Sequence, residues 1–325
     1  MDIIDTLNDS IRIPIIAEKA YLNSFRGAIH SGYVVDNNSI LPFVIRKKIF
    51  LKWIELPCAP LFCISANQEQ TFVDKAVYVL KKKYRPSHIQ TNNTAIFDLY
   101  PKKSTYCKFG TYIIDLSISE EELLAKMHSK HRNVVRRAEK DGITVFNGNE
   151  YAEEVVSLMN DTYVRQGKVS GLDKHFITSL NSLGDNVSYW VAMDIDGHTQ
   201  GSAILLWSED ETCYYLHGGS ANQTKPGSMN YLIWRAMLYM KSKGVKYFDF
   251  VGARVTTEAG SKLEGIQRFK SRFGADMKVG FMWRCVTSNI HYYFYRILMY
   301  MYLRVLKRDK SNYDIIAEER SKGNI

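Results

Sequence analysis

The segment Gly265–Gly274 (GIQRFKSRFG) interleaves basic side chains with two phenylalanines. A lysine held in a cleft can oppose the negative charge that develops on a carbonyl oxygen during acyl transfer. Lys270 lies between Phe269 and Ser271, where it could play that part. A helix with one apolar and one basic face would produce the same pattern, so the segment alone leaves both interpretations open.

A second candidate is Asp249, in the aromatic run Tyr247–Gly252 (YFDFVG). A carboxylate buried alone in such a strand would cost too much free energy. We therefore expect Asp249 to be hydrogen-bonded or functional, unless it points to solvent at the strand end. Gly252 follows at the edge of the sheet, where ligand sites of α/β proteins tend to lie.

An anion site is the third candidate. Gly227, Ser228 and Asn230 open an apolar-periodic helix, and the unpaired N–H groups at a helix N-terminus bind anions. An acetyltransferase uses this place for the pyrophosphate of coenzyme A. The usual Gly-x-Gly or Gly-x-Ala pattern is absent, and an ordinary loop with a serine cap is an equal alternative.

The run Lys130–Gly142 (KHRNVVRRAEKDG) is strongly basic. Arg132, Arg136 and Lys140 are spaced four residues apart and share one helix face. Such a stripe can hold phosphates or a nucleic-acid backbone. On composition alone, a solvated face of a helix between domains is the favoured interpretation.

These candidates need elements that position them, and the two halves of the chain show one layout. Each half has an apolar hairpin, then a strand, a helix, a strand and a closing strand. We expect the hairpins at residues 32–45 and 189–207, the helices at 70–84 and 228–243, the next strands at 87–91 and 246–251, and the closing strands at 111–116 and 278–285. Further helices are expected at 119–141, with a Ser119–Glu122 capping box, and near 151–166 and 174–183. The halves thus predict two diverged α+β units.

Composition sets the class of protein. The chain has 325 residues, a net charge of +9 and 5 cysteines without a CxxC pair. Two domains, an anionic partner and free thiols in a reducing compartment are expected. The acidic N-terminus does not resemble a signal peptide, and no run of about 18 apolar residues occurs, so we expect a cytoplasmic protein. Histidines lack the spacing of metal ligands, and no metal is expected.

The C-terminal segment 289–308 combines six tyrosines and phenylalanines with Arg296, Arg304, Lys307 and Arg308. It is too charged to span a bilayer. It suits a helix packed on the protein body, which we favour slightly, or a helix lying on an anionic membrane.

Three parts of the chain, in this order, resemble the signature of the FemAB enzymes of the GNAT superfamily. They are residues 111–142 with the basic run, Tyr214–Ala221 (YYLHGGSA), and Tyr247–Gly252 followed by Gly265–Gly274. The resemblance extends from about residue 20 to 285. It implies an α+β fold of tandem GNAT-like domains, each a mixed, mostly antiparallel sheet flanked by helices.

The resemblance also implies an activity and its residues. FemAB enzymes use aminoacyl-tRNA as donor and a peptidoglycan precursor as acceptor, and related enzymes of polysaccharide gene clusters use acyl-CoA. The family's catalytic Phe-Lys pair corresponds to Phe269 and Lys270, and its phosphate-binding arginine to Arg165. The coiled-coil arm of tRNA-dependent members has no counterpart here, because only a short segment separates Ile143 from Trp190. This favours an acyl-CoA donor over tRNA.

We therefore expect an acyltransferase that acts on an amine or hydroxyl of a cell-envelope precursor or polysaccharide sugar. Its partners would be a small-molecule or lipid-linked sugar or peptide substrate, with peripheral contact to the inner membrane face left open. A peptidoglycan-bridge aminoacyltransferase, and a non-catalytic basic module binding membrane or RNA, are the alternatives. The expected domains are residues 1–118, a connecting helix 119–142, a catalytic domain 143–286 and a tail 287–325. Catalysis is assigned to Lys270, Phe269 and Asp249, substrate binding to Arg165, Arg132, Arg136, Tyr215 and Tyr231, and donor binding to Gly227, Ser228 and Asn230.

Overall fold

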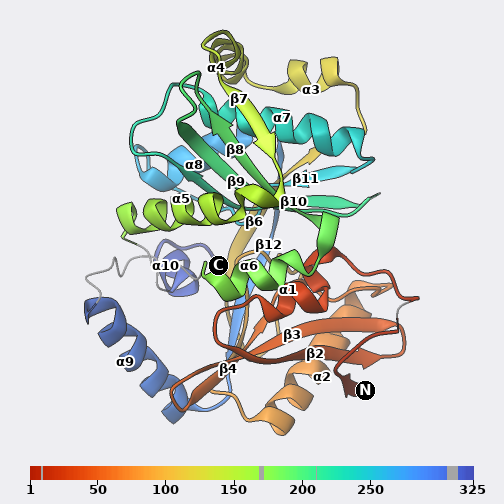
Figure 1. Ribbon diagram of the computed structural model, residues 1–325. Coiled ribbons are helices and arrows are strands. Elements are labelled where there is room, and N and C mark those ends of the chain that lie inside the picture. Colours follow the sequence, from red (N-terminus) through yellow and green to blue (C-terminus); the bar gives the residue numbers. More distant parts are fainter. Residues whose placement is uncertain (9, 168–171, 210, 306–313) are drawn as a thin grey trace. The chain divides into compact units, whose positions relative to one another are not determined.

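The computed structural model of the protein describes residues 1–8, 10–167, 172–209, 211–305 and 314–325. The chain forms two compact units (Figure 1). Unit 1 comprises Met1–Gly110, Gly252–Thr256 and Val279–Ile325, and unit 2 comprises Thr111–Val251 and Thr257–Lys278. Each unit is a mixed, mostly antiparallel sheet with helices against it, which is the α+β class that the sequence predicted.

In unit 1 the strands lie in the order β1-β2-β3-β4-β5-β12. Neighbouring strands are antiparallel except for the parallel pair β4 and β5, which helix α2 connects. Ser65 caps α2 by accepting a hydrogen bond from the N–H of Gln68, and the helix buries a face of regularly spaced apolar residues. The bounds are β1 (Asp2–Ile4), β2 (Ala28–Asp36), β3 (Ser39–Lys48), β4 (Leu51–Leu56), α2 (Ala66–Tyr84), β5 (His88–Thr91) and β12 (Asp276–Val286).

In unit 2 the strands lie in the order β6-β11-β10-β9-β8-β7. Here the parallel pair is β10 and β11, and helix α7 connects it. The left-handed backbone of Gly197 (φ +79°) turns the chain between β8 and β9, as expected for the Asp-Gly pair. The bounds are β6 (Thr105–Asp115), β7 (Thr144–Asn147), β8 (Val187–Met193), β9 (Thr199–Leu206), β10 (Thr212–Ser220), α7 (Ser228–Ser242) and β11 (Tyr247–Asp249).

The closing strands differ from the expectation. We expected 111–116 to close the first half and 278–285 the second. Instead, the Ile113–Asp115 part of β6 pairs with β11 in unit 2, and the Arg284–Val286 part of β12 pairs with β5 in unit 1. The alternation of apolar residues determines which face of a strand is buried, but it does not determine which strand becomes its neighbour.

The expected connecting helix is two helices of unit 2, α3 (Glu120–Lys126) and α4 (Ser129–Lys140). The predicted capping box of Ser119 and Glu122 is present, but Met127 adopts an extended conformation that ends α3, and the His128 side chain caps α4. Both helices bury apolar side chains in the core of unit 2. They therefore belong to the unit that holds the candidate site.

Different helices cover the two faces of the unit 2 sheet: α7 covers one face and α5 (Ala152–Arg165) the other. Ala203 and Leu205 of β9 belong to the core cluster that includes the buried face of α7. On β10, Gly219 lies so close to α5 that a Cβ there would be 3.1 Å from the Cα of Met159. The remaining helices are α1 (Lys19–Asn23), α5 (Ala152–Arg165), α6 (Lys174–Asn181), α8 (Lys262–Ser271), α9 (Asn289–Val305) and α10 (Ile315–Ser321), with 3-10 turns at Ile15–Ala17, Asn149–Tyr151 and Gly184–Asn186. Residues 306–308 of the expected tail helix lie outside the described part of the chain.

Candidate active site

Lys270 lies near the end of α8, and its side chain is turned into unit 2. It is only 8% exposed, and its Nζ donates a hydrogen bond of 2.5 Å to the carbonyl oxygen of Val251. Ser261 fixes the start of α8 by accepting a hydrogen bond from the N–H of Glu264. The helix thus holds a cation in a largely buried place, as an oxyanion-stabilising role requires.

The partner of Lys270 has an unusual backbone. Val251 has a φ of +39°, a value that β-branched residues very rarely adopt. Such a conformation costs about 1–3 kcal/mol and persists where the surroundings enforce it, often at a functional site. The strain turns the carbonyl of Val251 toward the Lys270 ammonium.

Asp249 joins the same group from the end of β11. One of its carboxylate oxygens accepts hydrogen bonds from the Thr111 hydroxyl and, at 2.8 Å, from the N–H of Val251. Burial raises the pKa of Asp249, while these hydrogen bonds and the positive charge of Lys270 oppose the rise. A carboxyl group with a raised pKa is suited to exchange protons with a substrate.

Strands β10 and β11 stop pairing at this group. Their register ends at Tyr214 and Asp249, whereas β10 continues to Ser220 and shifts register against β9 between Tyr215 and His217. The ring of Tyr215 packs edge-on against Phe250, with centroids 5.9 Å apart. A Cβ on Gly218 would lie 1.7 Å from the Tyr215 hydroxyl oxygen. Gly218 therefore leaves the room that the Tyr215 side chain occupies.

Phe269 and His131 fix the position of α8. The His131 Nε2 lies 3.1 Å from the carbonyl oxygen of Phe269, and its ring packs edge-on against Phe273. Burial lowers the pKa of His131 to about 4, so the ring is neutral near pH 7 and its N–H can donate to that carbonyl. The Phe269 ring contacts both partners. In the structure the Phe269 side chain therefore packs between α4 and the end of α8, next to Lys270 in the sequence.

The N-terminus of α7 packs closely against α4, a contact that the sequence did not predict. Gly227 has a φ of +86°, and a Cβ there would lie 2.3 Å from the carbonyl oxygen of Val134 in α4. The close packing of α7 on α4 therefore explains why residue 227 is a glycine. Ser228 is buried, with its hydroxyl donating to the Lys225 carbonyl at 2.8 Å, while Asn230 is partly exposed. Tyr231 is buried in the core and accepts a hydrogen bond from Arg235.

Of the three arginines assigned to substrate binding, Arg165 lies on α5, whereas Arg132 and Arg136 lie one turn apart on α4. The Arg165 guanidinium, at the end of α5, donates to the hydroxyl of Thr162 and the carbonyl of Ser220. Arg132 donates to the carbonyls of Leu124, Ala125 and Met127 at the end of α3, which indicates a helix-capping role. Arg136 is exposed on α4. The shared face of Arg132 and Arg136 is therefore only partly open to a ligand.

Sequence reasoning missed Thr111, Val251 and His131. Thr111 was visible only as one more residue of a strand, and its hydrogen bond to Asp249 depends on the pairing of β6 with β11. The left-handed backbone of Val251 has no signal in its residue type. His131 was visible only as one residue of the basic run.

One group of carboxylate and imidazole atoms could in principle hold a cation. Atoms of Asp194, Asp196 and His198 in the β8–β9 turn lie within 4.8 Å of one another. The Asp194 carboxylate, however, accepts hydrogen bonds from the N–H groups of Asp196 and His198 and from Gln200. The cluster is thus accounted for as a turn that Asp194 stabilises.

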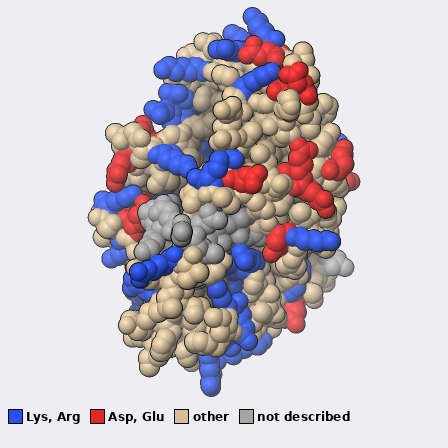
Figure 2. Space-filling model, turned by 60° about the vertical axis from the view of Figure 1, so that its left-hand side comes forward, with Lys and Arg blue, Asp and Glu red and all other residues tan. Residues whose placement is uncertain are grey.

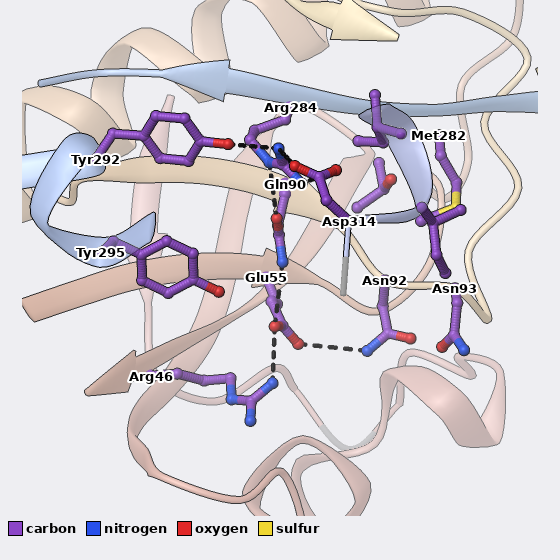
Figure 3. A pocket seen from close by; sticks show the side chains of 13 residues that line it. Arg46, Glu55, Gln90, Asn92, Asn93, Met282, Arg284, Tyr292, Tyr295 and Asp314 are labelled. Atoms are coloured by element: carbon purple, nitrogen blue, oxygen red, sulfur yellow. Dashed lines mark hydrogen bonds and ion pairs between the residues drawn. The ribbon is translucent and has the colours of Figure 1, made fainter. Parts of the chain in front are cut away.

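Unit 1 contains a polar pocket of about 180 Å³ on one face of its sheet (Figure 3). Glu55 of β4 accepts hydrogen bonds from Arg46, Gln90 and Asn92. Arg284 of β12 donates to Gln90 and forms a two-bond ion pair with Asp314, at 2.7 and 2.9 Å. Arg46 and Glu55 are paired across the neighbouring strands β3 and β4, and Arg284 is paired with Asp314 at the N-terminus of α10, as buried charges require.

Residues of the C-terminal tail line this pocket. Tyr292 and Tyr295 of α9 line it, and the Tyr292 hydroxyl accepts a hydrogen bond of 2.5 Å from Arg284. Both rings also contact the buried imidazole of His88. One side of α9 is therefore packed on unit 1, which agrees with the packed-helix interpretation of the tail.

A model of a known protein family matches part of the chain. Residues 125–271 match the family model described as an acetyltransferase (GNAT) domain, and this range contains α4, α7, Asp249 and Lys270. A search of curated proteins finds no match in sequence.

Solved structures share the fold over most of the chain. FemX is 13% identical, with a TM-score of 0.60 over 83% of this chain and 94% of that chain. L-PGS from Bacillus licheniformis is also 13% identical, with a TM-score of 0.56 over 89% and 92%. The C-terminal domain of a putative lysylphosphatidylglycerol synthetase from Agrobacterium fabrum is 12% identical, with a TM-score of 0.57 over 81% and 85%.

Proposed function

We propose that this chain, of which residues 125–271 match an acetyltransferase (GNAT) domain model and which shares its fold with FemX and L-PGS, is a FemAB-like enzyme that transfers an acyl or aminoacyl group to an amine or hydroxyl of a cell-envelope precursor or polysaccharide sugar. The observation behind the proposal is the group formed by Lys270, the strained carbonyl of Val251 and the buried carboxyl of Asp249. In this group a lysine and a buried carboxyl both contact Val251, close to the point where β10 and β11 stop pairing.

In the proposed reaction the acceptor nucleophile attacks the carbonyl carbon of the donor directly. The new bond to nitrogen or oxygen forms as the carbonyl electrons move to its oxygen, and Lys270 stabilises that negative charge. The oxygen–carbon double bond then re-forms and expels the thiolate or alkoxide of the donor. Asp249 accepts the proton of the nucleophile, a role that its raised pKa supports. Holding both substrates in place can contribute about 7–11 kcal/mol, so no covalent enzyme intermediate is required.

We place the phosphates of an acyl-CoA donor at the N-terminus of α7, beside Ser228 and Asn230. Helix N-termini favour anions through their unpaired N–H groups and their dipole. Arg165, Tyr215 and the exposed Arg136 are the proposed contacts for a phosphorylated acceptor. The buried Tyr231 supports α7 through the core.

The thermal stability of the purified protein, measured with acetyl-CoA and separately with charged tRNA, tests the proposal. A donor at 100 times its dissociation constant stabilises by about 2.7 kcal/mol. Asn230→Asp puts a negative charge beside the donor phosphates and should reduce the stabilisation by acetyl-CoA. Asn67→Asp makes the same change in the first turn of α2 and is the matched control. Stabilisation by tRNA alone would favour the bridge-forming alternative, and no stabilisation by either would contradict both donors.

A further inference from the structure

Helix α9 is apolar on both sides. Its inner side packs on unit 1 through Tyr292, Tyr295 and the buried Leu303. Its outer side exposes a continuous stripe at helical spacing: Ile290 (70% exposed), Tyr293 (63%), Phe294 (48%), Ile297 (37%), Tyr300 (47%), Met301 (57%) and Val305 (79%). A helix that is apolar all round is normally covered on all sides, and large exposed apolar patches mark interaction surfaces.

The turn between β3 and β4 exposes two more apolar residues of unit 1. Ile49 and Phe50 are both 65% exposed. Ile49 also has a φ of +57°, a conformation in which tight turns normally use Gly or Asn. The fold therefore does not explain an isoleucine here, because its backbone is unfavourable and its side chain contributes little to the core.

One contact joins this turn to α9. The Lys48 Nζ lies 3.0 Å from the centre of the Tyr302 ring, a cation–π distance. Trp53, on the strand that leaves the turn, contacts the Tyr295 ring with centroids 5.2 Å apart. The exposed residues of the turn and of α9 thus belong to neighbouring elements of one unit.

The surroundings of these residues are basic. Residues 44–54 contain Arg46, Lys47, Lys48 and Lys52 and no acidic residue, and residues 288–305 contain Arg296 and Arg304 and no acidic residue. Burial, and then the charges of Arg26 and Arg46, lower the pKa of Lys48. Figure 2, turned toward the side on which α9 lies in Figure 1, shows uncharged surface in its lower part with Lys and Arg beside it.

We propose that the outer side of α9 and the Ile49–Phe50 turn dock unit 1 on the surface of an anionic lipid bilayer. Apolar side chains with Lys and Arg beside them fit the boundary between acyl chains and anionic headgroups. A second copy of the chain would bring the same basic residues against themselves, which opposes self-association. Among the described residues no helix is long and apolar enough to cross a membrane, so α9 would lie along the surface.

Cosedimentation with lipid vesicles tests the proposal. The probes are vesicles of phosphatidylglycerol mixed with phosphatidylcholine, and vesicles of phosphatidylcholine alone. The full chain should bind the first kind at least about tenfold more strongly, and Phe50→Glu and Phe294→Glu should each weaken that binding at least about tenfold. Ile195→Glu, at a residue that is 77% exposed in unit 2, should leave binding unchanged.

Three results would overturn the proposal: no preference for the anionic vesicles, equal loss in the Ile195→Glu control, or retained binding in both phenylalanine variants. Sedimentation velocity without lipid provides a separate readout. A concentration-dependent dimer that Phe294→Glu abolishes would instead assign this surface to a second copy. The vesicle assay needs no acyl donor, so its outcome is independent of the proposed transfer reaction.

Discussion

The Nζ of Lys270 donates a hydrogen bond of 2.5 Å to the carbonyl oxygen of Val251, and Val251 holds a left-handed backbone with a φ of +39°. The N–H of Val251 in turn donates to Asp249. One strained residue thus contacts both ionisable groups of the candidate site. Its carbonyl contacts the cation and its amide contacts the carboxylate, so this one residue connects the two charged groups.

Asp249→Asn tests the carboxyl group as proton acceptor. An amide keeps the size and can still accept from Thr111 and Val251, but it cannot take a proton from the nucleophile. We expect kcat to fall about 10²- to 10⁴-fold, with a smaller change in KM. Asp276→Asn, at an exposed residue of unit 2, is the control in the same kinetic assay. Equal rates in the Asp249 variant and wild type would remove the carboxyl group from the mechanism.

His131→Gln tests how α8 is held. The folded pKa of His131 is lowered to about 4 from 6.5, so the unfolded chain binds more protons between these values. Wild-type stability should therefore fall as the pH drops from about 6.5 toward 4. The glutamine can still donate to the Phe269 carbonyl and does not titrate. Urea unfolding of both proteins at several pH values gives the difference, and a difference independent of pH would contradict the assignment.

Gly227→Ala tests whether this glycine serves packing. Its added Cβ would meet the Val134 carbonyl at 2.3 Å, in a backbone with a φ of +86°. Gly260 has a similar φ of +75° but nothing within 4 Å of such a Cβ. Gly260→Ala should cost about 1–2 kcal/mol from the backbone alone, and Gly227→Ala clearly more, because the α4 backbone must also move. If denaturant unfolding shows the same loss of unfolding free energy in both variants, the contact with α4 is not the reason for the glycine at 227.

Arg132 and Arg136 separate a structural arginine from an exposed one. Arg132→Ala removes hydrogen bonds to carbonyls at the end of α3 and should lower the free energy of unfolding by about 1–3 kcal/mol. Arg136→Ala should change it by less than about 0.5 kcal/mol, while weakening the binding of a phosphorylated acceptor. Denaturant unfolding and acceptor binding should be measured on both variants. A large loss of stability in Arg136→Ala, with little change in Arg132→Ala, would contradict the assignment.

The sequence was sufficient to predict the hairpins, the crossover helices and the α+β class, because apolar periodicity and turn residues are local signals. The Ser119 capping box and the Asp196-Gly197 turn are examples. It did not predict that β6 and β12 each pair in the other half, since pairing partners are not encoded locally. For the same reason Asp249 and Lys270 were found by residue type, while Thr111 and Val251 were not. The short 3-10 turn Ile15–Ala17 was not predicted.

The most direct test of the proposed transfer is the release of free thiol from acetyl-CoA in the presence of a nucleotide-linked amino sugar. Lys270→Met keeps much of the side-chain volume and removes the charge, and Lys262→Met makes the same change at an exposed position of α8. We predict that Lys270→Met lowers the rate about 10²- to 10³-fold while circular dichroism shows a retained fold, and that Lys262→Met matches wild type. A Lys270→Met protein that releases thiol at the wild-type rate would contradict the account.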